Sequence, residues 1–73
     1  MMNREKDYKL VKDLAEGDTV YISWFEEGGG QVFRTETSYI LYEIPQYGGE
    51  ERFVAEYILS DYRALVDEAW SWT

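Results

Sequence analysis

Residues 37–59, TSYILYEIPQYGGEERFVAEYIL, decide the fold, because a strong turn signal separates two apolar runs. Pro45 has no N–H to donate to a sheet ladder, so the first strand is expected to end before it. The pair Gly48–Gly49 supplies the positive φ that a tight reversal requires. The stretch therefore predicts a hairpin whose strands span residues 38–44 and 52–59.

The returning strand follows the two-residue period of a β-strand, which assigns its side chains to the two faces of the sheet. One face is expected to hold Phe53, Ala55, Tyr57 and Leu59, and the other Val54 and Ile58. The run from Thr37 to Ile44 has two interpretations: a separate strand, or a bent continuation of the strand before it.

A second hairpin is predicted on the N-terminal side of this stretch. Residues 16–18, Glu-Gly-Asp, are a turn signal, and residues 18–25 then alternate with β-branched and aromatic side chains. Three glycines at positions 28–30 interrupt the pattern, which resumes over residues 32–37. We expect two strands joined by a tip that contains the three glycines.

The two ends of the chain differ in the strength of their pattern. Residues 1–7 are polar and are expected to be flexible, whereas residues 8–14 fit a short helical turn as well as an extended segment. Residues 61–72 are predicted to form a helix, with Ser60 or Asp61 as its N-cap. Its apolar stripe consists of Tyr62, Leu65, Val66, Ala69 and Trp70, with Trp72 at the margin.

These elements predict an α+β fold: a small antiparallel sheet of three to five strands with the C-terminal amphipathic helix packed on one face. The alternative is a small SH3-like β-barrel with a terminal helix. The chain has 73 residues and no cysteine, so we predict one domain without disulfides. Its 7 Tyr, 3 Trp and 3 Phe residues would supply much of the buried area.

The charge is strongly negative and unevenly distributed. The chain carries 15 acidic and 7 basic residues, a net charge of −8. Its three lysines and Arg4 all lie within residues 1–12, ahead of an acidic body. Such a field repels nucleic acid and anionic membranes and attracts basic protein surfaces, although solubility alone also explains it. The sequence shows neither a secretory leader nor a run of about 20 apolar residues. A cytoplasmic location is therefore predicted.

The residue types on which most enzymes rely are missing. Without histidine or cysteine, the chain lacks the commonest general base, the thiolate nucleophile and the usual zinc ligands. The pairs Glu26-Glu27 and Glu50-Glu51 flank glycine loops that are expected to be solvated, whereas a carboxyl group that acts as a general acid needs burial. Neither glycine cluster matches a phosphate-binding or calcium-binding motif. We therefore predict no catalysis, no cofactor and no metal site.

Direct nucleic-acid binding is also not expected. Tyrosines on a sheet can stack on bases, but such platforms are normally surrounded by lysine and arginine. Here the predicted strands carry Glu36, Glu43 and Glu56 instead. Core packing and cross-strand pairing are the simpler explanation of the tyrosines.

The second half of the chain, YILYEIPQYGGEERFVAEY…ALVDEAWSWT, resembles the end of uncharacterised small acidic proteins of Gram-positive bacteria and their phages or mobile elements. The resemblance covers residues 39–73 and consists of a strand, a P-x-x-GGE turn, a second strand and a short helix that ends in an aromatic residue. It implies a ββα unit and an origin in a mobile element. It brings no catalytic residues.

The leading hypothesis is a small acidic protein-binding module. Its acidic surface would dock on a basic, nucleic-acid-handling surface of a protein partner and block it, as an anti-CRISPR protein, an anti-restriction protein or a DNA mimic does. The predicted contact residues are Glu26, Glu27, Glu36, Glu43, Glu50, Glu51 and Glu56, with Tyr47 and Trp72 as apolar anchors.

Two other functions fit the same sequence. A structural or regulatory domain could act through homo-oligomerisation, with the edge strand at residues 52–59 pairing across a two-fold axis and the acidity serving solubility. A binder of a small ligand or a peptide could use a sheet edge or an aromatic cleft.

Overall fold

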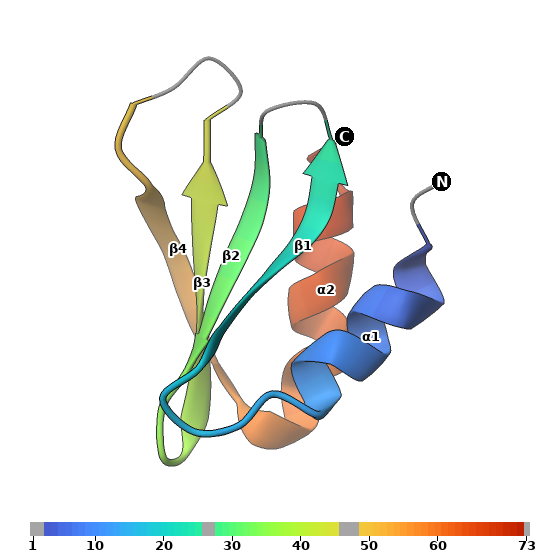
Figure 1. Ribbon diagram of the computed structural model, residues 1–73, viewed down its shortest axis with the longest axis vertical. Helices are drawn as coiled ribbons and strands as arrows, with labels where there is room; N and C mark the ends of the chain where they lie inside the picture. Colours follow the sequence, from blue (N-terminus) through green and yellow to red (C-terminus); the bar gives the residue numbers. More distant parts are fainter. Residues whose placement is uncertain (1–2, 26–27, 46–48, 73) are drawn as a thin grey trace.

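The computed structural model describes residues 3–25, 28–45 and 49–72, which form two α-helices and a four-stranded antiparallel sheet, an α+β fold (Figure 1). The elements in chain order are α1 (Arg4–Lys12), β1 (Thr19–Phe25), β2 (Gly28–Arg34), β3 (Ser38–Ile44), β4 (Arg52–Ile58), a 3₁₀ turn η1 (Leu59–Asp61) and α2 (Tyr62–Trp70). Residues 38–44 thus form a strand of their own, β3, and are not a bent continuation of the strand before them, β2.

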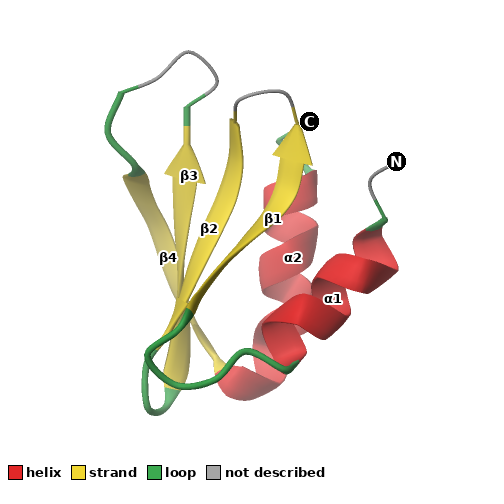
Figure 2. Ribbon diagram, in the orientation of Figure 1, coloured by secondary structure: helices red, strands yellow, loops and turns green. Residues whose placement is uncertain are grey.

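The sheet is a simple meander in the order β1-β2-β3-β4, so β1 and β4 are its two edges. Within the described residues the sheet stays open, and the alternative of a closed barrel is therefore wrong. Both helices lie on the same side of the sheet, as Figure 2 shows. The C-terminal helix α2 packs against β1, β3 and β4, which confirms its predicted place on one face.

Helix α1 includes residues for which the sequence predicts flexibility. The side chain of Asn3 caps the helix by accepting a hydrogen bond from the N–H of Glu5 at 2.9 Å. Acidic residues occupy the first turn and basic residues the last turn, an arrangement that the helix dipole favours. Positions 4–7 are therefore ordered, and the segment that follows is helical rather than extended.

Strand β2 begins four residues earlier than predicted and ends at Arg34, so Gly28–Gly30 belong to the strand and not to a turn tip. A Cβ atom at Gly30 would lie only 3.2 Å from the Cβ of Ala69 in α2 and 3.2 Å from the side chain of Ile22. The glycine is needed because the helix and the neighbouring strand approach the backbone closely here.

Strand β4 contains a bulge that changes the predicted assignment of its faces. Phe53 is paired with Tyr42, whereas Ala55 is paired with Leu41, so Val54 is an extra residue in the ladder. Phe53 therefore lies on the face opposite to Ala55, and the prediction of a shared face is wrong. The strand also ends at Ile58, because Leu59 begins the 3₁₀ turn.

The core fills the space between the helices and the inner face of the sheet. Its fully buried members are Val11, Ile22, Val32, Tyr39, Leu41, Leu65, Val66 and Ala69. The α2 stripe is as predicted, and Tyr62 and Trp70 pack partly buried at its margin. Asp61 stands at the N-cap position, although its side chain makes no capping hydrogen bond, and the helix ends at Trp70, two residues before the predicted end. Among the described residues, neither helix has the length and apolar character that a membrane crossing requires.

Candidate functional site

The middle strand β3 has apolar side chains on both faces of the sheet. Tyr39 and Leu41 are buried in the core. Because successive side chains of a strand point to opposite faces, Ile40, Tyr42 and Ile44 lie on the face away from the helices. A solvent-facing side of an antiparallel sheet normally carries polar residues. The apolar character of this face therefore needs an explanation.

The strand registers extend this face across the whole sheet, since directly paired residues share a face. We call the helix-free side of the sheet the open face. Its apolar side chains are Tyr21, Phe33, Ile40, Tyr42, Ile44, Phe53 and Ile58, and its polar side chains are Thr19, Gln31, Ser38 and Glu56.

The β4 side of the open face is the most exposed. Phe53 and Ile58 keep 59% and 62% of their surface accessible, and Tyr21 on the opposite edge is exposed as well. The rings of Tyr42 and Phe53 form an edge-to-face pair with centroids 6.3 Å apart and an interplanar angle of 77°. Such a pair holds the aromatic surface in a defined orientation before any partner arrives.

The open face carries one charged side chain among the described residues, Glu56. Its Oε2 atom accepts a hydrogen bond from Ser38 Oγ at 2.6 Å, and that hydroxyl lies 2.7 Å from Thr35 Oγ1. These contacts orient the carboxylate beside the turn between β2 and β3. Ser38 is thereby buried and hydrogen-bonded, and it is not an accessible nucleophile.

The other predicted contact residues do not gather into one acidic surface. Glu43 points to the helix side of the sheet, opposite to Glu56, and forms an ion pair with Arg52, whose Nε donates to it at 3.0 Å. Glu36 is exposed in the turn at one end of the sheet, while Glu50 and the adjacent Glu51 are exposed at the other end, before β4. The length of β3, about 20 Å for seven residues, separates these two ends.

Trp72 belongs to the helix layer. Its side chain packs partly buried against the core, and its Nε1 donates to Glu68 Oε2 at 2.9 Å. Trp72 therefore lies away from the open face, and it does not sit beside Glu56 as the predicted apolar anchor would. The predicted contacts Glu26, Glu27 and Tyr47 lie outside the described residues.

A buried polar cluster joins the helices to β1. Asp7 Oδ2 accepts hydrogen bonds from the backbone N–H of Ser23 and from Trp70 Nε1, each at 2.8 Å, and Ser23 Oγ donates to the carbonyl of Ala69 at 3.1 Å. Ser23 has a positive φ of 51° at an irregularity in β1. Because Asp7 and Ser23 are buried and these bonds use their polar atoms, the cluster is structural.

The helix surface above this cluster is held by a second polar group around Tyr8. Its hydroxyl donates a hydrogen bond to Asp67, which raises the pKa of Tyr8 above its ordinary value. Asp67 also pairs with Arg4 at 3.5 Å, and the guanidinium of Arg63 stacks 4.8 Å from the Tyr8 ring centre. These contacts of Tyr8 and Arg4 fasten α1 to α2.

Burial raises the pKa of Tyr39 in the core and of Tyr57, which packs partly buried against the core.

In the described part of the chain, no three acidic side chains come close enough together to hold a metal ion.

The open face, with its exposed apolar side chains, is the most distinctive surface of the described residues. Sequence reasoning about charge missed it, yet a signal was present: SYILYEI in β3 is apolar at adjacent positions instead of alternating with polar residues.

Comparisons with protein-family models, with curated proteins and with solved structures found no match to this chain.

Proposed function

We propose that the protein is a protein-binding module and that the open face is its docking surface. The observation that carries the proposal is the set of seven apolar side chains on the helix-free side of the sheet, three of which, Tyr21, Phe53 and Ile58, are more than half exposed. Four seven-residue strands span roughly 400 Å² in projection at ordinary strand spacing. The open face as a whole, polar side chains included, is thus of the same order as the largest apolar patches of monomers, about 300–600 Å², which are often functional.

Charge indicates the kind of partner. The molecule has a net charge of −8, and the described side chains of the open face include Glu56 but no lysine or arginine. Glu36 at one end of the sheet and Glu50 at the other add negative charge around the apolar centre. The complementary surface has an apolar centre and a basic periphery, which would also accelerate association at low salt.

Two observations favour such a partner over a second copy of this chain. Two copies that met through their open faces would bring like charges together at both ends of the sheet. Pairing through the exposed edge of β4 would meet the bulge at Val54, which interrupts the regular ladder that strand addition requires. Homo-oligomerisation is therefore the less supported function.

The specific role remains the one that the sequence suggests: an inhibitor that covers a basic, nucleic-acid-handling surface. A module of this kind needs no catalytic group, because it acts by occupying the surface. The proposed contact residues differ from those predicted from the sequence, which were mainly glutamates. Phe53, Ile58 and Tyr42 supply the apolar centre, while Glu36, Glu50, Glu51 and Glu56 supply the charge.

The test begins with capture from a lysate of the host, and the decisive step uses the captured protein in purified form. Calorimetry then compares the wild type with the double variant Phe53→Asp/Ile58→Asp. Each of these positions is exposed, so the fold should persist, and circular dichroism checks it. Loss of a central aromatic contact costs about 2 kcal/mol, or roughly 30-fold in Kd.

Charge variants distinguish long-range electrostatic attraction, which sets the association rate, from direct contacts, which set the dissociation rate. Glu50→Lys/Glu51→Lys should slow association several-fold at low salt and should change dissociation little. Glu43→Gln is the matched control, because Glu43 lies on the helix side and is already paired with Arg52. Binding that is unchanged in Phe53→Asp/Ile58→Asp would refute the open face as the docking surface. Capture of no protein except this chain, with concentration-dependent sedimentation, would replace the proposal with homo-oligomerisation.

A further inference from the structure

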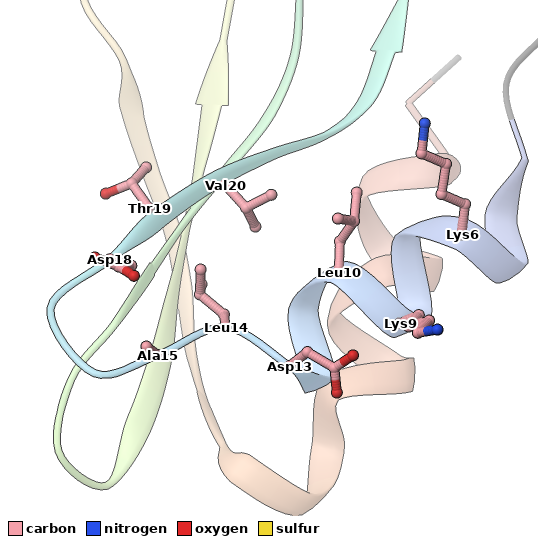
Figure 3. Close-up of a pocket in the computed structure, with 9 residues that line it drawn as sticks. All are labelled: Lys6, Lys9, Leu10, Asp13, Leu14, Ala15, Asp18, Thr19 and Val20. Carbon is pink, nitrogen blue, oxygen red and sulfur yellow. The ribbon is translucent and has the colours of Figure 1, made fainter.

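A second surface feature, separate from the open face, is a groove between α1 and the edge strand β1 (Figure 3). It has a volume of about 580 Å³ and opens to solvent. Residues 6–15 provide one wall and residues 18–20 the other. Since α1 and β1 are not paired in the sheet, the groove follows a sheet edge along its helix side.

The centre of the groove is apolar. In Figure 3 the side chains of Leu10, Leu14 and Val20 extend into the space between the helix and the strand. Leu14 and Val20 pack partly buried against the core, whereas Leu10 keeps 36% of its surface exposed. An aliphatic side chain of a ligand would cover Leu10 and complete this small cluster.

The two ends of the groove carry opposite charge. Lys6 lies at the end formed by the first half of α1, and Asp18 lies at the other end, where β1 begins (Figure 3). Lys9 and Asp13 also line the groove, one of each charge, so they leave this difference between the ends in place. Within the described ranges, neither side chain takes part in an ion pair within 4.0 Å. A ligand that carries a carboxylate near Lys6 and a cation near Asp18 would therefore be complementary in charge.

The edge of β1 also offers backbone groups. The Asp18 carbonyl accepts a hydrogen bond from the N–H of Arg34 in β2 at 3.0 Å. Because bonding directions alternate along an antiparallel strand, Thr19 directs its N–H and C=O away from β2. The N–H of Ser23, four residues further along, also points away from β2, but it donates a hydrogen bond to Asp7. The accessible part of the edge therefore lies at the Thr19 end.

We propose that this groove binds an extended peptide segment of a partner protein as an added strand antiparallel to β1. Since β1 runs from the Asp18 end toward the Lys6 end, an antiparallel segment runs the other way. Its residues would follow the order acidic, aliphatic, basic from N- to C-terminus. Backbone bonds at Thr19 would supply affinity, and Leu10, Lys6 and Asp18 would supply the selection among sequences.

The probe is a display library of random heptapeptides, selected on the immobilised full-length protein. We expect enriched peptides to contain an aliphatic residue preceded by Asp or Glu and followed by Lys or Arg. The most enriched peptide, synthesised with blocked ends, should perturb the amide NMR signals of Leu10, Thr19 and Val20. Leu10→Asp should weaken its binding at least about tenfold, because the aliphatic contact is lost.

Charge exchange provides a second, independent variant in case Leu10→Asp does not fold. Lys6→Glu should weaken the same peptide about fivefold, and a peptide with its acidic residue replaced by lysine should recover that loss. Lys12→Glu is the matched control, since Lys12 lies on the same helix outside the groove.

Three outcomes would overturn the proposal. One is a selection that yields no peptide whose binding depends on Leu10 or Lys6. Another is binding that Phe53→Asp/Ile58→Asp abolishes, which would place the peptides on the open face. The third is groove occupancy by a second copy of this chain, seen as concentration-dependent sedimentation that Leu10→Asp removes. Because the groove variants and the open-face variants are different residues, either proposal can fail without the other.

Discussion

Asp7 and Trp70 lie 63 positions apart in the chain and are joined by a hydrogen bond of 2.8 Å between the carboxylate and the indole N–H. The same carboxylate oxygen accepts the N–H of Ser23, also at 2.8 Å. One acidic side chain therefore ties α1, α2 and the irregular segment of β1 together. In a chain without disulfides, this contact replaces part of the support that a small core lacks.

Replacing Asp7 with alanine is expected to be strongly destabilising. The change leaves the Ser23 N–H and the Trp70 indole N–H without their acceptor in a site that is only 9% exposed at Asp7. Unsatisfied buried donors cost about 1–3 kcal/mol each, so the free energy of unfolding should fall by about 2–4 kcal/mol. Urea unfolding followed by circular dichroism measures this loss.

Asp7→Asn is the matched control, because the amide keeps one acceptor oxygen and nearly the same volume. It should retain more than half of the stability that Asp7→Ala loses. A free energy of unfolding for Asp7→Ala within about 0.5 kcal/mol of the wild type would show that the two donors find other partners or water.

Gly30→Ala tests the close approach of α2 to β2. The new methyl group would meet Ala69 Cβ and Ile22 Cγ1 at 3.2 Å and Leu41 Cδ1 at 3.4 Å. We expect a net loss of about 1–2 kcal/mol in the free energy of unfolding, since overpacking outweighs the lower entropy of the unfolded chain. Denaturant titration gives the value.

Gly17→Ala separates packing from backbone conformation. Gly17 has a φ of +84°, and nothing lies within 4 Å of a Cβ placed there. It should cost about 1 kcal/mol through the left-handed conformation alone. Truncating Ile22 to alanine should then lessen the effect of Gly30→Ala and leave that of Gly17→Ala unchanged. Equal effects in both backgrounds would contradict the steric explanation.

The buried tyrosines predict a loss of stability in alkali. Burial raises the pKa of Tyr39 and Tyr57 above the value of about 10 that applies in the unfolded chain. Below about pH 10 both states bind the phenolic proton, and their full contribution to stability is present. As the pH rises from the unfolded pKa toward the folded pKa, the unfolded state releases its proton first.

The free energy of unfolding should therefore fall above about pH 10, by up to about 1.4 kcal/mol per pH unit for each buried tyrosine in that window. The double variant Tyr39→Phe/Tyr57→Phe should show a shallower decline. Part of the decline should remain, because the hydrogen bond to Asp67 also raises the pKa of Tyr8. The same slope in variant and wild type above about pH 10 would contradict the assignment.

Glu43→Gln should change stability little, in contrast to Asp7→Ala. The ion pair of Glu43 with Arg52 is solvent-exposed, with 68% of the arginine side chain accessible. Exposed pairs contribute up to about 1 kcal/mol and weaken as salt increases. Thermal unfolding at low and high salt measures the difference. A loss of more than about 2 kcal/mol that is insensitive to salt would show that Glu43 has a structural role.

Several elements follow from local sequence alone. The end of β3 before Pro45, the strand itself and the apolar stripe of α2 were all predicted, because their signals are short-range periods and single-residue backbone preferences. The Asn3 cap of α1 is also local, and it could have been predicted from Asn3 and the acidic first turn. The candidate open face was only partly predictable, from the unbroken apolar run in β3.

The amino-acid sequence by itself determined the α+β class, the helical stripe and the excess of negative charge. Only the tertiary structure decided that Gly30 lies under α2, that Val54 is a bulge which places Phe53 on the open face, and that Asp7 is buried. The physical reason is that periodicity acts between neighbours in the chain. Close packing and hydrogen-bond satisfaction instead depend on partners that are distant in sequence and meet only in the folded protein.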